Sequence, residues 1–302
     1  LGGSGCDRCA AGTRLARAGL PMHAARDRLQ PLDVVLRRGK TYTWTRRTVL
    51  GLSLVVTLGL PLWHLAALGA ATPPLVGPVG AFDLFGLELI DPLAILSVVL
   101  ARGPSVALAL TALPALLLVA VLGRFFCGWL CPYIPLIAAS NAARWGLARA
   151  GFKPLDVRLP RRTSYALLVG VLALGAVTGS QIWPLVYPPS IIGREVFHAV
   201  FFGGLGAGAF FIAFAVAFDT FFSRAGFCRS LCPGGAVFSL LGARSPITVR
   251  LDKAKCTDCT ACDVVCNLGQ SPMTARIDEG CERCGKCVAS CPTDALKLGV
   301  RR

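Results

Sequence analysis

The sequence predicts a polytopic α-helical membrane protein that carries a small α+β domain at its C-terminus. Of the 302 residues, 54% are hydrophobic and only 16% are charged, with a mean hydropathy of +0.63. Soluble domains are about 25% charged. Four segments are long and apolar enough to span a bilayer, which takes about 20 residues. The last part of the chain is instead polar and rich in cysteine, so we expect a separate domain there.

Four apolar segments are predicted to form transmembrane helices. They lie at residues 48–69, 104–123, 163–183 and 198–222. His64 stands in the otherwise apolar first segment, and Asp219 is the only charge of the last. Ionisable residues in such segments are uncommon and are often functional. His64 and Asp219 are therefore candidate proton-handling residues.

The charge distribution predicts the orientation of these helices. Lys and Arg collect before the first segment and between the second and third, whereas the other two connections carry only Arg102 and Arg194. Positively charged loops stay in the cytoplasm. We therefore expect a multi-pass protein of the bacterial inner (cytoplasmic) membrane, in contact with the lipid bilayer and with both termini in the cytoplasm. The net charge of +15 lies in these blocks, so it indicates topology and excludes nucleic acid as a partner.

The chain is predicted to have a basic cytoplasmic N-terminal segment, a membrane domain and a C-terminal domain, at residues 1–46, 47–245 and 246–302. We expect the first part to be disordered, or in part an over-long reading frame that truly starts at Met22. The CxxC pair of Cys6 and Cys9 within it is expected to be incidental. For the first apolar segment, "WTRRTVLGLSL" also resembles a twin-arginine signal, and a retained helix is the favoured interpretation. Between the first two segments, "IDPLAILSVVLARG" is too short to span and predicts a helix that opens at Asp91 and Pro92.

The C-terminal domain carries the strongest chemical signal, "CTDCTACDVVCN" followed by "CERCGKCVASCP". Each run has the spacing C-x2-C-x2-C-x3-C, and fourteen residues separate the runs. Iron–sulfur cubanes take four thiolates, and in two-cluster ferredoxins the fourth cysteine of each run binds the other cluster. This predicts a bacterial-type 2[4Fe-4S] ferredoxin domain. Cluster 1 would be bound by Cys256, Cys259, Cys262 and Cys291, and cluster 2 by Cys281, Cys284, Cys287 and Cys266.

A pair of zinc sites is the alternative, because CxxC pairs also bind zinc. Two matched runs, the second followed by Pro292, make that interpretation the weaker one. The first run departs from the pattern, since Asn267 stands where a proline is expected. The flanking segments "ITVRLD" and "ALKLGV" predict the two short strands of this small fold. The sequence shows no nucleotide, flavin or c-type haem motif.

A second cysteine motif occurs twice, each time after an apolar segment. "RFFCGWLCP" contains Cys127 and Cys131, and "GFCRSLCP" contains Cys228 and Cys232 at an offset of 101 positions. In a helix, residues four apart lie on one face, and the proline ends or kinks that helix. The four thiols would meet if the two repeats pack together. They would then form a further metal or cluster site, a redox-active dithiol relay, or a set of buried structural cysteines. All three interpretations remain open at this point.

Two CxxxCP motifs followed by a double ferredoxin run resemble the NapH family of membrane ferredoxins and its MauN relatives. The likeness covers about residues 45–300 and includes "FDLFGLELIDPL", "RFFCGWLCP" and "IWPLVYPPSIIGR". The resemblance implies a component of a quinol dehydrogenase that exchanges electrons with the quinone pool. It also implies a redox partner, either an extracytoplasmic ferredoxin or a multihaem cytochrome.

A quinol site needs an apolar slot and a group that takes protons. Besides His64 and Asp219, the sequence offers candidates on the outer side, which are Asp83, Glu88, Asp91, Trp183, Tyr187, Arg194, Glu195 and His198. Two other functions stay open. The first is a maturation factor that reduces a metal or a cysteine during assembly of another redox enzyme. The second is a simple membrane anchor for a ferredoxin.

Overall fold

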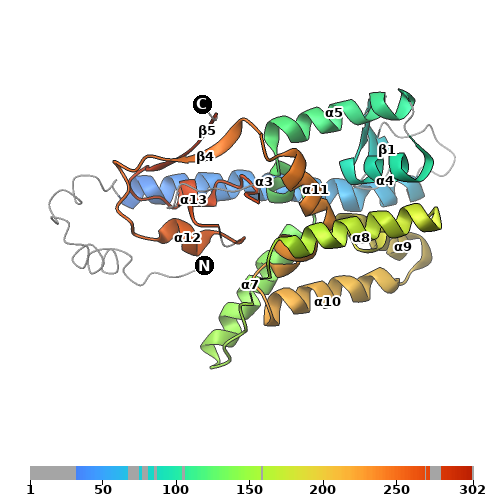
Figure 1. Cartoon of the computed structure of the whole chain (residues 1–302). Coiled ribbons are helices and arrows are strands. Elements are labelled where there is room, and N and C mark those ends of the chain that lie inside the picture. The colour runs from blue at the N-terminus through green and yellow to red at the C-terminus, as the bar shows by residue number, and fades with distance from the viewer. Residues whose placement is uncertain are drawn as a thin grey trace. The chain divides into compact units, whose positions relative to one another are not determined.

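The structure is a computed structural model, and it describes residues 32–66, 75–76, 81–84, 87–103, 106–157, 159–268, 270–272 and 280–300 (Figure 1). The chain divides into two compact units. One consists of Leu1–Arg47 and Pro246–Arg302, and the other of Thr48–Ser245. The predictions for Cys6, Cys9 and Met22 lie outside the described residues.

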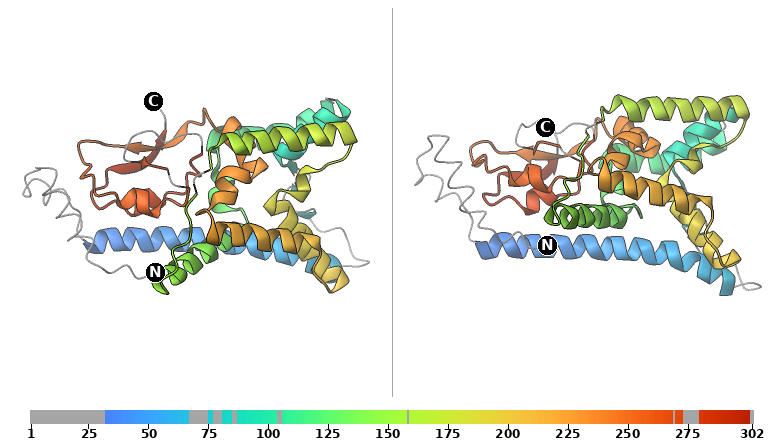
Figure 2. Two further views of the ribbon diagram at one scale, coloured as in Figure 1. Left: turned by 60° about the horizontal axis from the view of Figure 1, so that its bottom comes forward. Right: turned by 90° about the horizontal axis from the view of Figure 1, so that it is seen from below.

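The Thr48–Ser245 unit is mostly helical, as the composition predicted. Its elements in chain order are the second part of α3 (Leu32–Ala66), β1 (Leu75–Val76), β2 (Ala81–Leu84), β3 (Leu87–Ile90), α4 (Pro92–Arg102), α5 (Val106–Leu122), α6 (Phe125–Trp129), α7 (Ile134–Arg149), α8 (Arg162–Thr178), η1 (Trp183–Leu185), α9 (Pro188–Phe202), α10 (Ala207–Phe221), η2 (Phe227–Leu231) and α11 (Pro233–Leu241). Helix α10 packs against α7 and α9, and α8 packs against α4 and α11 (Figures 1 and 2).

Helix α4 shows how local sequence sets an element boundary. The carboxylate of Asp91 accepts a hydrogen bond from the backbone N–H of Leu93 at 2.8 Å, and Pro92 occupies the first helical position. Aspartate is a favoured N-cap and proline a favoured first residue. The predicted helix start at Asp91 and Pro92 is therefore confirmed.

The predicted membrane spans overlap helices α3, α5, α8 and α10, and the fourth span is divided, because α9 ends at Phe202 and α10 begins at Ala207. However, no helix among the described residues combines the length and the apolar character that crossing a bilayer requires.

A small antiparallel sheet was missed by the sequence reasoning. Strands β1, β2 and β3 form a meander in that order, and Ala81 pairs with Ile90 while Leu84 pairs with Leu87. The alternating apolar residues of "AFDLFGLELI", with a glycine between the two strands, are a hairpin signal.

The other unit contains the small C-terminal α+β domain and the first part of α3. Its further elements are β4 (Ile247–Leu251), α12 (Ala261–Val265), α13 (Lys286–Ala289) and β5 (Leu296–Val300). Strands β4 and β5 pair antiparallel, with Ile247 opposite Val300 and Leu251 opposite Leu296, so both predicted flanking strands are confirmed. The core of the domain contains Val249, Ala295 and Leu296 beside the ligand candidates Cys262 and Cys291.

Candidate functional site

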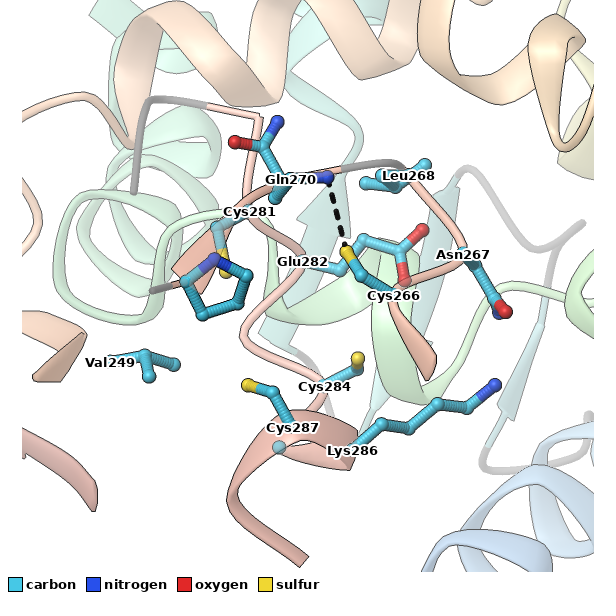
Figure 3. Close-up of a pocket in the computed structure, with 12 residues that line it drawn as sticks. Val249, Cys266, Asn267, Leu268, Gln270, Cys281, Glu282, Cys284, Lys286 and Cys287 are labelled. Carbon is cyan, nitrogen blue, oxygen red and sulfur yellow. Dashed lines mark hydrogen bonds between the residues drawn. The ribbon is translucent and has the colours of Figure 1, made fainter. Parts of the chain in front are cut away.

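Four cysteines of the C-terminal domain line one cavity (Figure 3). They are Cys266, Cys281, Cys284 and Cys287, the set predicted for cluster 2. Cys287 lies on α13, whereas Cys266 follows α12. The structure thus brings the last cysteine of the first run to the first three cysteines of the second run.

The two cysteine runs share an unusual backbone. Asp258 and Arg283, at matching positions, have φ angles of 48° and 50°, and Thr260 and Gly285 have φ angles of 60° and 71°. Non-glycine residues adopt this left-handed region only where the surrounding structure requires it. Both runs therefore bend in the same way between their first and third cysteines, as two equivalent cluster-binding loops would.

The donor set around the cavity fits an iron–sulfur cluster. The backbone N–H of Gln270 donates to the Sγ of Cys266 at 3.3 Å, and that of Arg283 donates to the Sγ of Cys281 at 3.4 Å. Such hydrogen bonds favour thiolate over thiol and influence cluster potentials. Among the described residues, no three Cys, His, Asp or Glu side chains converge on a point that a single metal ion would occupy. Each cysteine of a cubane binds a different iron, so a cluster does not need such convergence.

Burial favours the protonated form of two of the ligand thiols, Cys262 and Cys284. It raises the pKa of Cys262 to about 12 and that of Cys284 to about 11. Metal ligands of this kind must lose their protons on binding. Cluster insertion is therefore expected to release protons at neutral pH.

The four CxxxCP cysteines also line one cavity. Cys127, Cys131, Cys228 and Cys232 surround it, and Arg124, Tyr133 and Tyr187 complete much of its wall. Both copies fold alike, because the backbone N–H of Cys131 donates to the carbonyl of Phe126 at 3.0 Å and that of Cys232 to the carbonyl of Phe227 at 2.9 Å. The cysteines of the two repeats therefore lie at one cavity, as expected if the repeats pack together.

A buried guanidinium and a backbone amide lie beside these thiols. Arg124 is only 3% exposed and donates to the hydroxyl of Ser239 on α11 at 3.1 Å. The Sγ of Cys232 accepts from the N–H of Gly235 at 3.4 Å. Burial nevertheless raises the pKa of the Cys232 thiol to about 12. A thiol of this kind is a poor nucleophile for disulfide exchange, which disfavours an uncoordinated dithiol relay.

Two tyrosine–aspartate pairs flank the CxxxCP cavity. Tyr187 donates to the carboxylate of Asp91 at 2.9 Å, and Tyr133 donates to that of Asp219 at 3.0 Å. Asp219 is fully buried and also accepts from the N–H of Phe227 at 2.8 Å. Sequence reasoning named Asp91, Tyr187 and Asp219 but missed Tyr133, whose position directly after the first CxxxCP was the available signal.

Two other predicted quinol candidates, Glu195 and His198, are not among the residues that line this cavity. Glu195 accepts from the N–H groups of Gly206 and Gly208 at the start of α10, at 2.7 and 3.1 Å. His198 Nδ1 lies 3.0 Å from the carbonyl oxygen of Gly204, and its ring contacts the ring of Phe202 at a tilt of 35°. These contacts are structural and join α9 to α10.

Of the remaining candidates, Arg194 lies on α9 and Trp183 is buried in η1. Asp83 and Glu88 are opposite each other on β2 and β3, and His64 lies on α3. The side chains of these last three are outside the described part of the chain.

Replacing Gly234 with alanine is expected to destabilise the Thr48–Ser245 unit by about 2–3 kcal/mol, because an added Cβ would lie 2.2 Å from Cε2 of Tyr187 and overpacking costs about 1–3 kcal/mol. Thermal unfolding of the purified protein measures the effect. Gly170→Ala on α8 is the matched control, since a Cβ there meets nothing within 4 Å. Equal melting temperatures for the two variants would contradict the packing of Tyr187 on Gly234.

Two sequence families match the chain, and both are described as a 4Fe-4S binding domain. One covers residues 103–142 and 205–249, which include both CxxxCP motifs. The other covers residues 275–297, which include the second ferredoxin run. No solved structure matches the chain.

Relatives extend this likeness to most of the chain. The "Ferredoxin-type protein NapH" of Haemophilus influenzae is 32% identical over 235 residues, which are 74% of this chain and 79% of that protein. The protein of the same name from Escherichia coli is 33% identical, over 59% of this chain and 62% of its own length. The "Methylamine utilization ferredoxin-type protein MauN" of Methylorubrum extorquens is 33% identical, over 63% and 64%. Together with the cysteine geometry, these comparisons show that the chain is an iron–sulfur electron-transfer protein and belongs to the NapH and MauN family of ferredoxin-type proteins.

Proposed function

We propose that the protein is the membrane-bound component of a quinol dehydrogenase, which takes electrons from a quinol and delivers them to a redox partner. The observation that carries this proposal is the CxxxCP cavity. It combines four thiols with a tyrosine–aspartate pair, Tyr187 and Asp91, that can accept a proton. Quinol oxidation releases protons together with electrons, so both kinds of group are needed at one site.

Exposed apolar side chains support a membrane location. They form stripes on the four helices that contain the predicted spans, and their exposed fractions are 47% or more. On α3 they are Leu52, Val55, Leu58 and Leu62, on α5 Val106, Leu110, Leu113, Leu117, Leu118 and Val121, on α8 Val169, Leu174 and Val177, and on α10 Phe210, Phe214 and Phe221. Large exposed apolar patches mark protein or membrane contacts. We propose that these stripes face lipid.

Asp91 is the favoured proton acceptor. Burial raises its pKa to about 6, although hydrogen bonds from Leu93 and Tyr187 oppose the rise. A general base works best when its pKa is near the working pH. Asp91 would take the first proton of the quinol through the hydroxyl of Tyr187, and the proton would then pass to solvent.

The CxxxCP cysteines are proposed to bind a further iron–sulfur centre. All four line one cavity beside the buried Arg124, and a guanidinium offsets the negative charge of a tetrathiolate site. The family described as 4Fe-4S binding includes these cysteines. A structural role would not require four cysteines at one cavity.

The implied partner is an extracytoplasmic ferredoxin or a multihaem cytochrome, as the resemblance to NapH suggests. A maturation factor for another redox enzyme is the second candidate function. MauN, to which the chain is also similar, is named for methylamine utilization, so the family is not confined to one electron-transfer pathway.

Reduction by quinol separates these functions. A reduced short-chain quinol added to the anaerobic, cluster-loaded protein is expected to bleach the iron–sulfur absorbance within seconds. In Asp91→Asn the rate should fall by about a hundredfold to ten-thousandfold, because general-base catalysis contributes about 10²–10⁴. The asparagine preserves the cap on Leu93. If quinol reduces no centre, with or without the partner, the dehydrogenase proposal is wrong.

The same preparation tests the further centre. We expect roughly twelve irons per chain, four for each of three clusters, and roughly eight after Cys127→Ala and Cys131→Ala. Roughly eight irons in the unchanged protein would rule out the further iron–sulfur centre without affecting the ferredoxin clusters.

A further inference from the structure

Matching positions of the two ferredoxin runs carry opposite charges. Asp258 in the first run and Arg283 in the second have nearly the same backbone conformation. Between Cys256 and Cys266 the charged residues are two carboxylates, those of Asp258 and Asp263. Between Cys281 and Cys291 they are Glu282, Arg283 and Lys286. The two clusters are therefore held by similar loops in different electrostatic surroundings.

Carboxylates stand close to the sulfurs of the first run. The Oδ1 of Asp258 lies 3.5 Å from the Sγ of Cys256, and the Oδ1 of Asp263 lies 3.8 Å from the Sγ of Cys262. Negative charge at this range opposes the arrival of another electron on a cluster. Cluster 1 is therefore the harder one to reduce.

Cations and amide donors surround the second set of sulfurs. Figure 3 shows Lys286 among the residues that line this cavity, and the backbone N–H of Gln270 pointing at Cys266. The N–H of Arg283 points at Cys281 in the same way. Glu282, which is 6% exposed, supplies the one opposing charge. Hydrogen bonds to the sulfurs and positive charge both stabilise the reduced cluster.

Helix α3 adds a further cation to cluster 2. Gly39, Tyr42 and Arg46 lie on one face of α3, at helical spacing. A Cβ on Gly285 would lie 3.0 Å from Cε2 of Tyr42, and one on Gly39 would lie 3.9 Å from the carbonyl of Ala289. Both contacts place this face of α3 on α13 and the loop before it. Arg46 is only 8% exposed and lies one helical turn after Tyr42 on this face, so its charge is held on the side of α3 that meets the second run.

We infer that these side chains separate the reduction potentials of the two clusters, and that cluster 2 has the higher one. Lys286 and Glu282 line the cavity of cluster 2, Arg283 stands in the same run and Arg46 on the adjoining face of α3, whereas Asp258 and Asp263 lie beside ligands of cluster 1 and the neighbouring Lys255 is paired with Asp252. In the singly reduced protein the electron leaves cluster 1 and resides on cluster 2, with no other reactant consumed. This inference depends only on the two ferredoxin clusters, so it can fail while the quinol proposal holds, and the reverse.

A redox titration of the cluster-loaded full chain, followed by electron paramagnetic resonance, tests the inference. We expect the two ferredoxin clusters to titrate in two separate one-electron steps, and Cys127→Ala with Cys131→Ala identifies any step of a centre at the CxxxCP cysteines. Cys266→Ala should remove the step at higher potential and thereby identify cluster 2. In Arg46→Gln that step should move down by about tenfold in its equilibrium constant, which equals about 59 mV for one electron, while Arg46→Lys restores it. In Asp258→Asn the lower step should move up by a similar amount.

Lys297→Gln on β5 is the matched control, because this exposed lysine is also in the domain but is not among the cavity residues. It should leave both steps unchanged. If both ferredoxin clusters of the unchanged protein titrated at one potential, the inference would be overturned, as it would be by an effect of Arg46→Gln on the lower step. If Arg46→Gln fails to fold because Arg46 is buried, the potential of the lower step in Asp258→Asn tests the inference instead, since Asp258 is exposed. An unmoved lower step in that variant would also overturn the inference.

Discussion

Replacing Cys266 with alanine is expected to abolish cluster 2 and to leave cluster 1 intact, although Cys266 belongs to the first run. In the structure Cys266 lines a cavity with Cys281, Cys284 and Cys287, and a cubane that loses one of four thiolates is lost or strongly destabilised. Electron transfer through the domain should fall by more than about a hundredfold, since its path loses one cluster. A hundredfold change corresponds to under about 3 kcal/mol in the activation free energy of electron transfer.

The measurement is electron paramagnetic resonance of the reduced protein, together with iron analysis. Cys287→Ala must remove the same signal as Cys266→Ala, and Cys291→Ala must remove the other signal. If Cys266→Ala and Cys259→Ala instead removed one common signal, each run would bind its own cluster and the crossed ligand sets would be wrong.

Replacing Asp219 with leucine is expected to destabilise the Thr48–Ser245 unit by about 3–5 kcal/mol. Leucine is close to aspartate in size but accepts no hydrogen bond. The hydroxyl of Tyr133 and the backbone N–H of Phe227 would both lose their acceptor, at a site where Asp219 is fully buried. A buried donor left without an acceptor costs about 1–3 kcal/mol, and hydrogen bonds to charged groups are the stronger ones.

Chemical denaturation followed by circular dichroism measures this loss. Asp219→Asn is the matched control, because the amide oxygen can keep one of the two donors and the loss should be about half as large. Tyr133→Phe removes one donor and leaves the other bond in place. A leucine variant as stable as the unchanged protein would show that the carboxylate does not hold Tyr133 and Phe227 as the structure has them.

The sequence allowed accurate predictions wherever a local pattern implies a local contact. The cysteine spacing and the flanking segments were enough for strands β4 and β5, and Asp91 followed by Pro92 was enough for the start of α4. The meeting of the two CxxxCP motifs followed from their repetition.

Other features depend on contacts between distant residues. The bond between Tyr133 and Asp219 joins positions 86 apart, and that between Tyr187 and Asp91 joins positions 96 apart. The basic N-terminal segment was expected to extend to residue 46 and to be disordered. In the structure α3 already begins at Leu32, and Tyr42 on this helix lies against Gly285. No periodicity within α3 indicates which surface that face will contact.

The two CxxxCP repeats share one hydrogen-bond pattern, yet they have stopped being interchangeable. Tyr133 follows the first Cys-Pro and Gly234 the second. Gly234 leaves the space that the ring of Tyr187 fills, while Tyr133 reaches across to Asp219. Gly234 and Tyr187 both belong to the second repeat, whereas the bond between Tyr133 and Asp219 joins the first repeat to the second. The two repeats therefore have different parts in building the cavity, and exchanging the residue after either Cys-Pro for its counterpart would remove one of these contacts.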